Sequence, residues 1–151
     1  SLFCAIFGIY SFIVLKYDFN KLSCLPCSYI MCDCNDLKGV NDHLGHSAGD
    51  TYIKATAEMI KNVLPENGIC VRWGGDEFLL ILPDCDEDAC KKLVEEMEEQ
   101  QKIKRKEIPY MEIAIGCQVR KSLHQDEDEV IKAADQNMYE DKKRKKAMEW
   151  K

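Results

Sequence analysis

The sequence has no excess of positive charge and no internal repeat, linker or change of composition. Its 27 acidic side chains outnumber its 21 Lys and Arg residues, and the formal net charge is −6. Proteins that bind nucleic acid or anionic membranes by general electrostatics are usually basic, so the composition argues against both classes of partner. We expect the 151 residues to form one domain, 1–151.

The sequence also lacks an apolar run long enough to span a membrane. Residues 2–15, "LFCAIFGIYSFIVL", fall short of the roughly 18 to 20 residues that a bilayer requires. They also lack the basic flank and cleavage site of a signal peptide. We expect an apolar helix within 1–22 that packs on the core, with the end of a membrane anchor as the alternative. Either interpretation predicts a cytoplasmic domain, free or attached to a membrane-anchored sensor.

Cysteine is abundant, with nine residues. Their scatter through apolar runs indicates small core residues in a reducing compartment, and not a disulfide framework. The stretch "CLPCSYIMCDC" (24–34) contains a C-x-x-C and has a zinc site as its alternative interpretation. Cys32 and Cys34 alternate with Met31 and Asp33, however, which favours a strand. The cysteines are Cys4, Cys24, Cys27, Cys32, Cys34, Cys70, Cys85, Cys90 and Cys117.

The apolar pattern predicts helices mixed with strands and one clear hairpin. This mixture indicates an α+β fold, in which helices pack on a mixed or antiparallel sheet. The expected elements after the N-terminal helix are a buried strand "SYIMCD" (28–33), a loop or short helix at 41–50, a helix from Ala48 to Pro65, the hairpin arms "GICVRW" (68–73) and "EFLLIL" (77–82), a helix after Pro83, a strand at 110–119 and a final helix that runs into "KKRKK" (142–146).

The stretch "VRWGGDEFLLIL" (71–82) places two glycines and two acids between the arms of the hairpin. Gly74 and Gly75 are typical of a tight turn, because glycine reaches the positive φ that primed turns need. A second interpretation is that the glycines leave room for a bulky ligand, while the neighbouring Asp76 holds a cation.

Three blocks together decide between these interpretations. "CDCNDLKGVNDHLGHSAGD" (32–50), "RWGGDEF" (72–78) and "AADQNMYEDKK" (133–143) resemble the GGDEF family, the diguanylate cyclases, in order and spacing, within a matched core of 27–146. The resemblance implies a nucleotidyl-cyclase palm, a mainly antiparallel central sheet of about five strands flanked by helices. It also implies the condensation of two GTP into cyclic di-GMP and two pyrophosphates, in bacterial second-messenger signalling.

The implied reaction is attack of a ribose 3′-OH on an α-phosphate, and it calls for Mg²⁺, or Mn²⁺ in its place, held by carboxylates. The resemblance assigns the metal to Asp33 and Asp76, with Cys34 offering only its main-chain carbonyl. Glu77 would assist the metal or take the proton of the 3′-OH. Asp33, Asp76 and Glu77 are therefore the candidate catalytic residues, although a lone acid at a strand end is more often a solvated turn residue.

The phosphates need donors. A helix that begins after Asp33 would offer the N–H groups of Asp36, Leu37 and Lys38 to the β- and γ-phosphates. The resemblance adds Lys142 and, where the family often has an arginine, Lys146. The other members of the run "KKRKK" are expected to form a solvated basic end of the helix.

Guanine donates hydrogen bonds from its N1–H and N2–H₂ edge, so a carboxylate or amide oxygen can distinguish it from adenine. Asn41 and Asp50 match the two guanine contacts of the family. Both residue types are also common at helix caps and turns, and Asp50 has this alternative.

The match fails in two places and leaves three functions open. Asn35 stands where many members carry a second aspartate, and "FCAIFGIY" (3–10) replaces the family's opening motif "LTGLxNR". An active cyclase is the first interpretation, and a catalytically weak domain that binds GTP as a sensor or adaptor is the second. A different metal-dependent cyclase on the same palm is the third, which Asn41 and Asp50 disfavour.

The resemblance has two further implications. Catalysis would need a homodimer, because each GTP attacks the other, and the upstream sensor that usually brings two copies together is expected to be absent from this chain. Many members also bind product at an R-x-x-D motif before the signature. Here its positions fall on Pro65 and Gly68, so we expect no product inhibition at that site.

Overall fold

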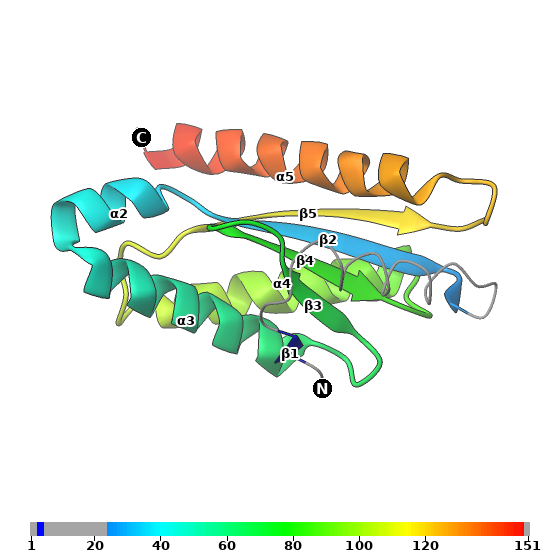
Figure 1. Ribbon diagram of the computed structural model, residues 1–151, viewed down its shortest axis with the longest axis horizontal. Helices are drawn as coiled ribbons and strands as arrows, with labels where there is room; N and C mark the ends of the chain where they lie inside the picture. Colours follow the sequence, from blue (N-terminus) through cyan, green and yellow to red (C-terminus); the bar gives the residue numbers. More distant parts are fainter. Residues whose placement is uncertain (1–2, 5–23, 150–151) are drawn as a thin grey trace.

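The computed structural model describes residues 3–4 and 24–149, which form a sheet with helices packed on it (Figure 1). The elements are β1 (Phe3–Cys4), β2 (Cys27–Cys34), α2 (Leu37–Leu44), α3 (His46–Val63), β3 (Ile69–Arg72), β4 (Glu77–Leu82), α4 (Glu87–Lys104), β5 (Ile113–Arg120) and α5 (Glu127–Glu149).

The strands form one five-stranded sheet in the order β1-β3-β4-β2-β5. The neighbours β3 and β4, β4 and β2, and β2 and β5 are antiparallel, and only β1 runs parallel to its neighbour β3. In Figure 1, α5 covers one face of the sheet, while α3 and α4 cover the other. The predicted α+β palm with a mainly antiparallel sheet is confirmed.

Strand β2 lies in the middle of the core, between β4 and β5. All eight of its residues are buried, because it lies between two strands and under helices on both faces. Ile30, Cys32 and Cys34 pack with the residues of α3 and α4, while Tyr29 and Met31 pack under α5. The continuous apolar run that predicted a buried strand therefore corresponds to a strand that is covered on both sides.

The helices follow the predicted apolar spacing. In α3, seven residues from Gly49 to Val63 are buried, and the helix ends before Pro65, which cannot continue it. The N-terminus of α4 is capped by Asp86, whose carboxylate accepts from the N–H of Ala89 at 2.8 Å. Within the described ranges, no helix has both the length and the apolar character needed to cross a bilayer.

The expectation of an N-terminal apolar helix is wrong at its beginning. Phe3 and Cys4 form β1, in register with Cys70 and Val71 of β3. A short apolar run fits a strand as well as a helix, and here the edge of β3 supplies the partner that periodicity cannot reveal. The rest of the segment 1–22 lies outside the described residues.

The hairpin is confirmed, but the first interpretation of its glycines, a turn that needs positive φ, is wrong. Trp73 and Gly74 close the turn by donating from their N–H groups to the carbonyl of Glu77, at 2.8 and 3.3 Å. Neither Gly74 nor Gly75 has a positive φ; among the described glycines, only Gly45 does. The space around Gly75 is open, since an added Cβ would meet no atom within 4 Å. This favours the interpretation in which the glycines leave room for a ligand.

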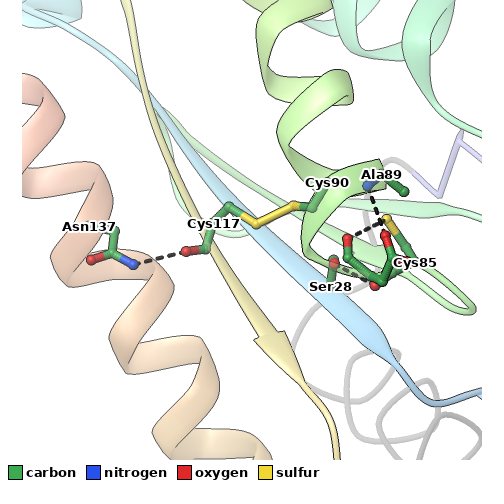
Figure 2. The surroundings of a disulfide bond; sticks show 7 residues. Ser28, Cys85, Ala89, Cys90, Cys117 and Asn137 are labelled. Carbon is green, nitrogen blue, oxygen red and sulfur yellow. Dashed lines mark hydrogen bonds between the residues drawn. A yellow bond between two sulfur atoms is a disulfide. The ribbon is translucent and has the colours of Figure 1, made fainter.

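The cysteines are mostly core residues, as predicted. Five free cysteines, Cys27, Cys32, Cys34, Cys70 and Cys85, are buried. The prediction is wrong for Cys90 of α4 and Cys117 of β5, which form a disulfide (Figure 2). The two lie 27 residues apart in the chain, and they meet because α4 packs on β5. The stretch 24–34 forms a strand from Cys27 onward, as its alternation predicted.

Candidate active site

Three acidic residues lie at the same end of the neighbouring strands β2 and β4. Asp33 of β2 and Glu77 of β4 are direct partners in the antiparallel register. The N–H of Cys34 donates to the main-chain carbonyl of Asp76 at 2.8 Å, which fixes the signature loop against the end of β2. Asp33 is buried, while Asp76 and Glu77 are half-buried. The local folding of strand and hairpin therefore brings the three candidate catalytic residues together.

Lys142 reaches this group from α5. Its Nζ lies 3.0 Å from Oδ1 of Asp33, across 109 residues of sequence. The side chains are 25% and 7% exposed, so the pair is only partly accessible to solvent. The lysine that the resemblance assigns to phosphate is thus a counter-ion of Asp33, which the resemblance assigns to the metal.

The group carries more negative charge than its one lysine neutralises. Burial raises the pKa of Asp33, and the nearby Asp76 and Asp135 raise it further, against the effect of Lys142. Burial also raises the pKa of Glu77, and Asp33, Asp135 and Asp76 add to the rise. A carboxylate cluster of this kind attracts a cation, because a cation relieves the repulsion between the acids.

Asp135 is a member of the cluster that the sequence analysis missed. It is exposed on α5, and its charge acts on both Asp33 and Glu77. A signal was present, because Asp135 lies seven residues before Lys142 and three before the inward-facing Met138, and this spacing places all three on one helical face.

The thiol of Cys34 lies in the core and contacts Thr56. Its Sγ lies 3.5 Å from Oγ1 of Thr56, and burial raises its pKa to about 12. A protonated thiol inside the core is a poor ligand for a hard cation. Only the carbonyl of Cys34 is suited to that role, as the sequence analysis expected.

The residues assigned to guanine lie on two successive helices. Asn41 is in α2 and Asp50 is in α3, and Gly45 joins the helices with φ 90°. An added Cβ on Gly49 would lie 1.8 Å from Oδ1 of Asn41, so the side chain of Asn41 lies directly against the glycine before Asp50. At the junction of the two helices, the N–H of Gly45 donates to the main-chain carbonyl of Asn41 at 3.0 Å.

The phosphate residues surround the start of α2 and the end of α5. Asp36 precedes α2 in a left-handed conformation with φ 53°, Leu37 begins the helix, and Lys38 is exposed in its first turn. Lys146 is exposed one turn beyond Lys142. In Figure 1, α2 and the C-terminal end of α5 lie at the same end of the sheet.

The expectation of a solvated basic end is wrong for Lys145. Its side chain is only 16% exposed, and its Nζ donates to the carbonyl of Ile113 at 2.6 Å. Arg144 pairs with the buried Asp141, while Lys143 is exposed as expected. The sequence run alone does not distinguish the mostly buried Lys145 from the exposed Lys143, because successive positions on a helix face different directions.

The donor set fits a magnesium ion that arrives with a triphosphate. In the part of the chain that the structure describes, no three His, Cys, Asp or Glu residues are arranged to hold a metal by themselves. Mg²⁺ needs no such cage, because it is often bound by one or two carboxylates, water and substrate phosphates. Asp33 and Asp76, with the carbonyl of Cys34, supply hard oxygen atoms of that kind.

A family model described as "Diguanylate cyclase, GGDEF domain" matches residues 15–148. The chain belongs to the GGDEF family. This domain is 33% identical over 119 residues to the probable diguanylate cyclase DgcJ of Escherichia coli (strain K12), covering 78% of this chain and 23% of that protein. It is 32% identical over 121 residues to the signaling protein YkoW of Bacillus subtilis (strain 168), covering 76% and 15%.

The fold of the GGDEF domain is also found among solved structures. The diguanylate cyclase SiaD from Pseudomonas aeruginosa, in complex with its activator SiaC, superposes with a TM-score of 0.75 at 21% identity, covering 89% of this chain and 54% of that one. This likeness shows that the chain has the cyclase palm fold. The chain spans less than a quarter of the length of DgcJ and YkoW.

Proposed function

We propose that this GGDEF domain, spanning 1–151, is a diguanylate cyclase that condenses two GTP into cyclic di-GMP and two pyrophosphates for bacterial second-messenger signalling. The observation that carries the proposal is the convergence of Asp33, Asp76, Glu77 and Lys142 at one end of the sheet. We place the domain on the cytoplasmic side, free or as part of a membrane-anchored sensor.

Each residue of the cluster has a separate task in this reaction. Asp33 and Asp76, with the carbonyl of Cys34, would bind Mg²⁺ or Mn²⁺, which neutralises the triphosphate and acidifies the attacking hydroxyl when bound. Glu77 assists as a metal ligand or as the acceptor of the 3′-OH proton. Burial and the neighbouring acids raise its pKa, which makes its carboxylate a stronger base than that of an exposed glutamate and supports the second task.

Phosphate and base are bound on either side of this cluster. The first N–H groups of α2, at Asp36, Leu37 and Lys38, face the β- and γ-phosphates, together with Lys142 and Lys146. Asn41 and Asp50 accept from the N1–H and N2–H₂ groups of guanine. The contact between Gly49 and Asn41 supports this role, because it holds the two acceptors on adjacent helices.

Two copies of the domain are required. One chain offers one such site, whereas the product contains two phosphodiester links made by reciprocal attack. A two-fold axis between facing copies satisfies both attacks at once. A sensor region outside this chain would control how often the copies meet.

A single incubation tests the function. The purified chain is mixed with GTP and Mg²⁺, and the products are analysed by mass spectrometry. Cyclic di-GMP and pyrophosphate are expected, and their absence despite calorimetric binding of GTP would support the second candidate, a GTP-binding sensor or adaptor. That candidate is favoured by one observation, the replacement of the family's opening motif by "FCAIFGIY" (3–10).

A further inference from the structure

Strand β5 is the last strand on its side of the sheet, and its outer edge is bonded by side chains. Asn137 of α5 donates to the carbonyl of Cys117 at 2.8 Å (Figure 2). Gln101 of α4 accepts from the N–H of Ile113 at 2.6 Å. Unpaired groups at a sheet edge must be satisfied or they invite pairing with another chain.

Asp141 and Lys145 of α5 complete this edge. Oδ2 of Asp141 accepts from the N–H of Ile115 at 2.9 Å, and Nζ of Lys145 donates to the carbonyl of Ile113 at 2.6 Å. The two side chains also pair with each other at 3.0 Å. We call Gln101, Asn137, Asp141 and Lys145 the edge clamp.

The edge clamp joins helices on opposite faces of the sheet. Nζ of Lys145 lies 2.7 Å from Oε1 of Glu98, and Glu98 accepts from the amide of Gln101 at 3.1 Å. Helices α4 and α5 are thus linked around the edge of β5, in addition to their separate apolar contacts with the sheet (Figure 1).

The apolar contacts of α5 end before the active site. The last α5 residue in the core cluster is Met138, and among the later described residues only Asp141 is buried, at 4% exposure. Near the middle of α5, the helix approaches β5 closely at Gly116 of the strand. An added Cβ on Gly116 would lie 2.0 Å from the main-chain N of Met138. Beyond Met138, the contacts of α5 with the sheet are polar: Asp141 and Lys145 bond to β5, and Lys142 pairs with Asp33 of β2.

Lys142 lies between these two residues in the chain and beside Asp33 in space. We propose that Asp141 and Lys145 are positioning residues that hold the Lys142 ammonium at the carboxylate end of the sheet, where it meets the triphosphate. The proposal rests on the proposed function for the identity of the ligand. It gives a role to an ion pair whose burial carries a desolvation cost.

The test compares two ligands that differ only in the part Lys142 contacts. A non-hydrolysable GTP analogue and guanosine are titrated with Mg²⁺ into Lys145→Met and Asp141→Asn, by calorimetry below the melting temperature of each variant. We expect the analogue to bind about tenfold more weakly, the scale of one charge-assisted hydrogen bond, while guanosine binds as in the wild type. Equal weakening of both ligands, or an unchanged affinity for the analogue, overturns the proposal.

Lys143→Met is the matched control, since Lys143 is exposed on the same turn and its contacts are with exposed residues, Glu140 at 3.4 Å and the ring of Tyr139 at 4.5 Å. Its affinity for the analogue should equal that of the wild type. A wild type that binds no GTP analogue would refute the proposed function. The role of the edge clamp is then tested separately, by the position of Lys142 in a crystal structure. In a crystal structure of ligand-free Lys145→Met, Lys142 should have left Oδ1 of Asp33; a retained pair overturns the proposal.

Discussion

The ammonium of Lys142 and the carboxylate of Asp33 form an ion pair at 3.0 Å. One partner belongs to the proposed metal site and the other to the proposed phosphate site. We expect the pair to weaken once both ligands bind, because a metal on Asp33 would compete with the lysine for the carboxylate. Lys142 is then free for the triphosphate, and binding of the cation and binding of the nucleotide support each other.

Replacing Lys142 by methionine should have opposite effects on the two ligands. Without nucleotide, Mn²⁺ should bind about fivefold more tightly, because a competing positive charge worth roughly 1 kcal/mol is gone. A GTP analogue should bind more weakly, because a phosphate donor is lost. Electron paramagnetic resonance of Mn²⁺ and calorimetry measure the two affinities. Weaker Mn²⁺ binding in Lys142→Met would show that the lysine supports the metal site and does not compete with it.

The sequence predicted the parts of the fold that have a local pattern. The alternating and apolar residues of β2 and β4 and the helical spacing of α3 are properties of single segments, and all three are confirmed. The strand Phe3–Cys4 and the pair Cys90–Cys117 depend on partners far away in the chain. No periodicity contains that information, and both were missed.

The candidate site shows the same division. Asp33, Asp76 and Glu77 were found because they stand in matched blocks, and the structure brings them together. Lys145 was missed because its role comes from the packing of α5 on the sheet, whereas the helical spacing of Asp135 from Lys142 was present in the sequence and was overlooked. A surface lysine and a lysine that bonds a strand edge look alike in a basic run.

Asp76→Asn should abolish cyclase activity and leave the fold intact. The main-chain carbonyl of Asp76, which holds Cys34, is unaffected by the substitution, and the side chain is only half-buried. We expect activity to fall by roughly two orders of magnitude or more, as for the loss of a metal contact. Mass spectrometry of the product and a melting curve are the measurements, with Glu95→Gln on the exposed face of α4 as control. A large fall in melting temperature without metal would indicate a structural role instead.

Glu77→Gln should stabilise the metal-free protein increasingly as the pH rises. The folded-state pKa of Glu77 is raised above its ordinary value of 4.5 by burial and by neighbouring acids. The folded state therefore binds the proton more tightly than the unfolded state, so the associated stability is present below pH 4.5 and is lost as the pH rises through the folded pKa.

The variant cannot lose this stability, since glutamine stays neutral. The gain at neutral pH should be no more than about 1 kcal/mol, because solvent screens a half-buried group. Melting temperatures of the wild type and Glu77→Gln in a chelator, from pH 4 upward, measure the difference. A difference that shrinks as the pH rises would contradict the charge cluster.

Cyclase activity should depend on protein concentration. If two chains must face each other, the rate per chain rises with concentration until the dimer is saturated. The measurement is initial rate over a wide dilution series, alongside the mass of the chain from light scattering. A rate per chain that stays constant on dilution, in a sample shown to be monomeric, is incompatible with reciprocal attack by two copies.

Added cyclic di-GMP should leave the initial rate unchanged below the concentrations at which it competes in the active site. The product-binding R-x-x-D motif of many family members would need an arginine at the position of Pro65 and an aspartate at that of Gly68. Gly68 is buried against Leu64, and an added Cβ would lie 2.9 Å from Cδ1 of that leucine, which would have to shift. Its N–H donates to the carbonyl of Pro65 at 2.9 Å, so both positions are committed to the turn between α3 and β3.

The neighbours of this turn cannot replace the motif. Asn67 donates to the carbonyl of Pro83 at 3.2 Å, and the guanidinium of Arg72 donates to the carbonyl of Gly75 at 2.6 Å within the signature loop. Glu66 is exposed, and its carboxylate would repel the phosphates of the product. The experiment is a titration of cyclic di-GMP into the chain saturated with a GTP analogue, followed by calorimetry. No heat of binding is expected, because the active site is filled and the turn offers no cation. Tight binding under these conditions would reveal a second site and refute this interpretation of Pro65 and Gly68.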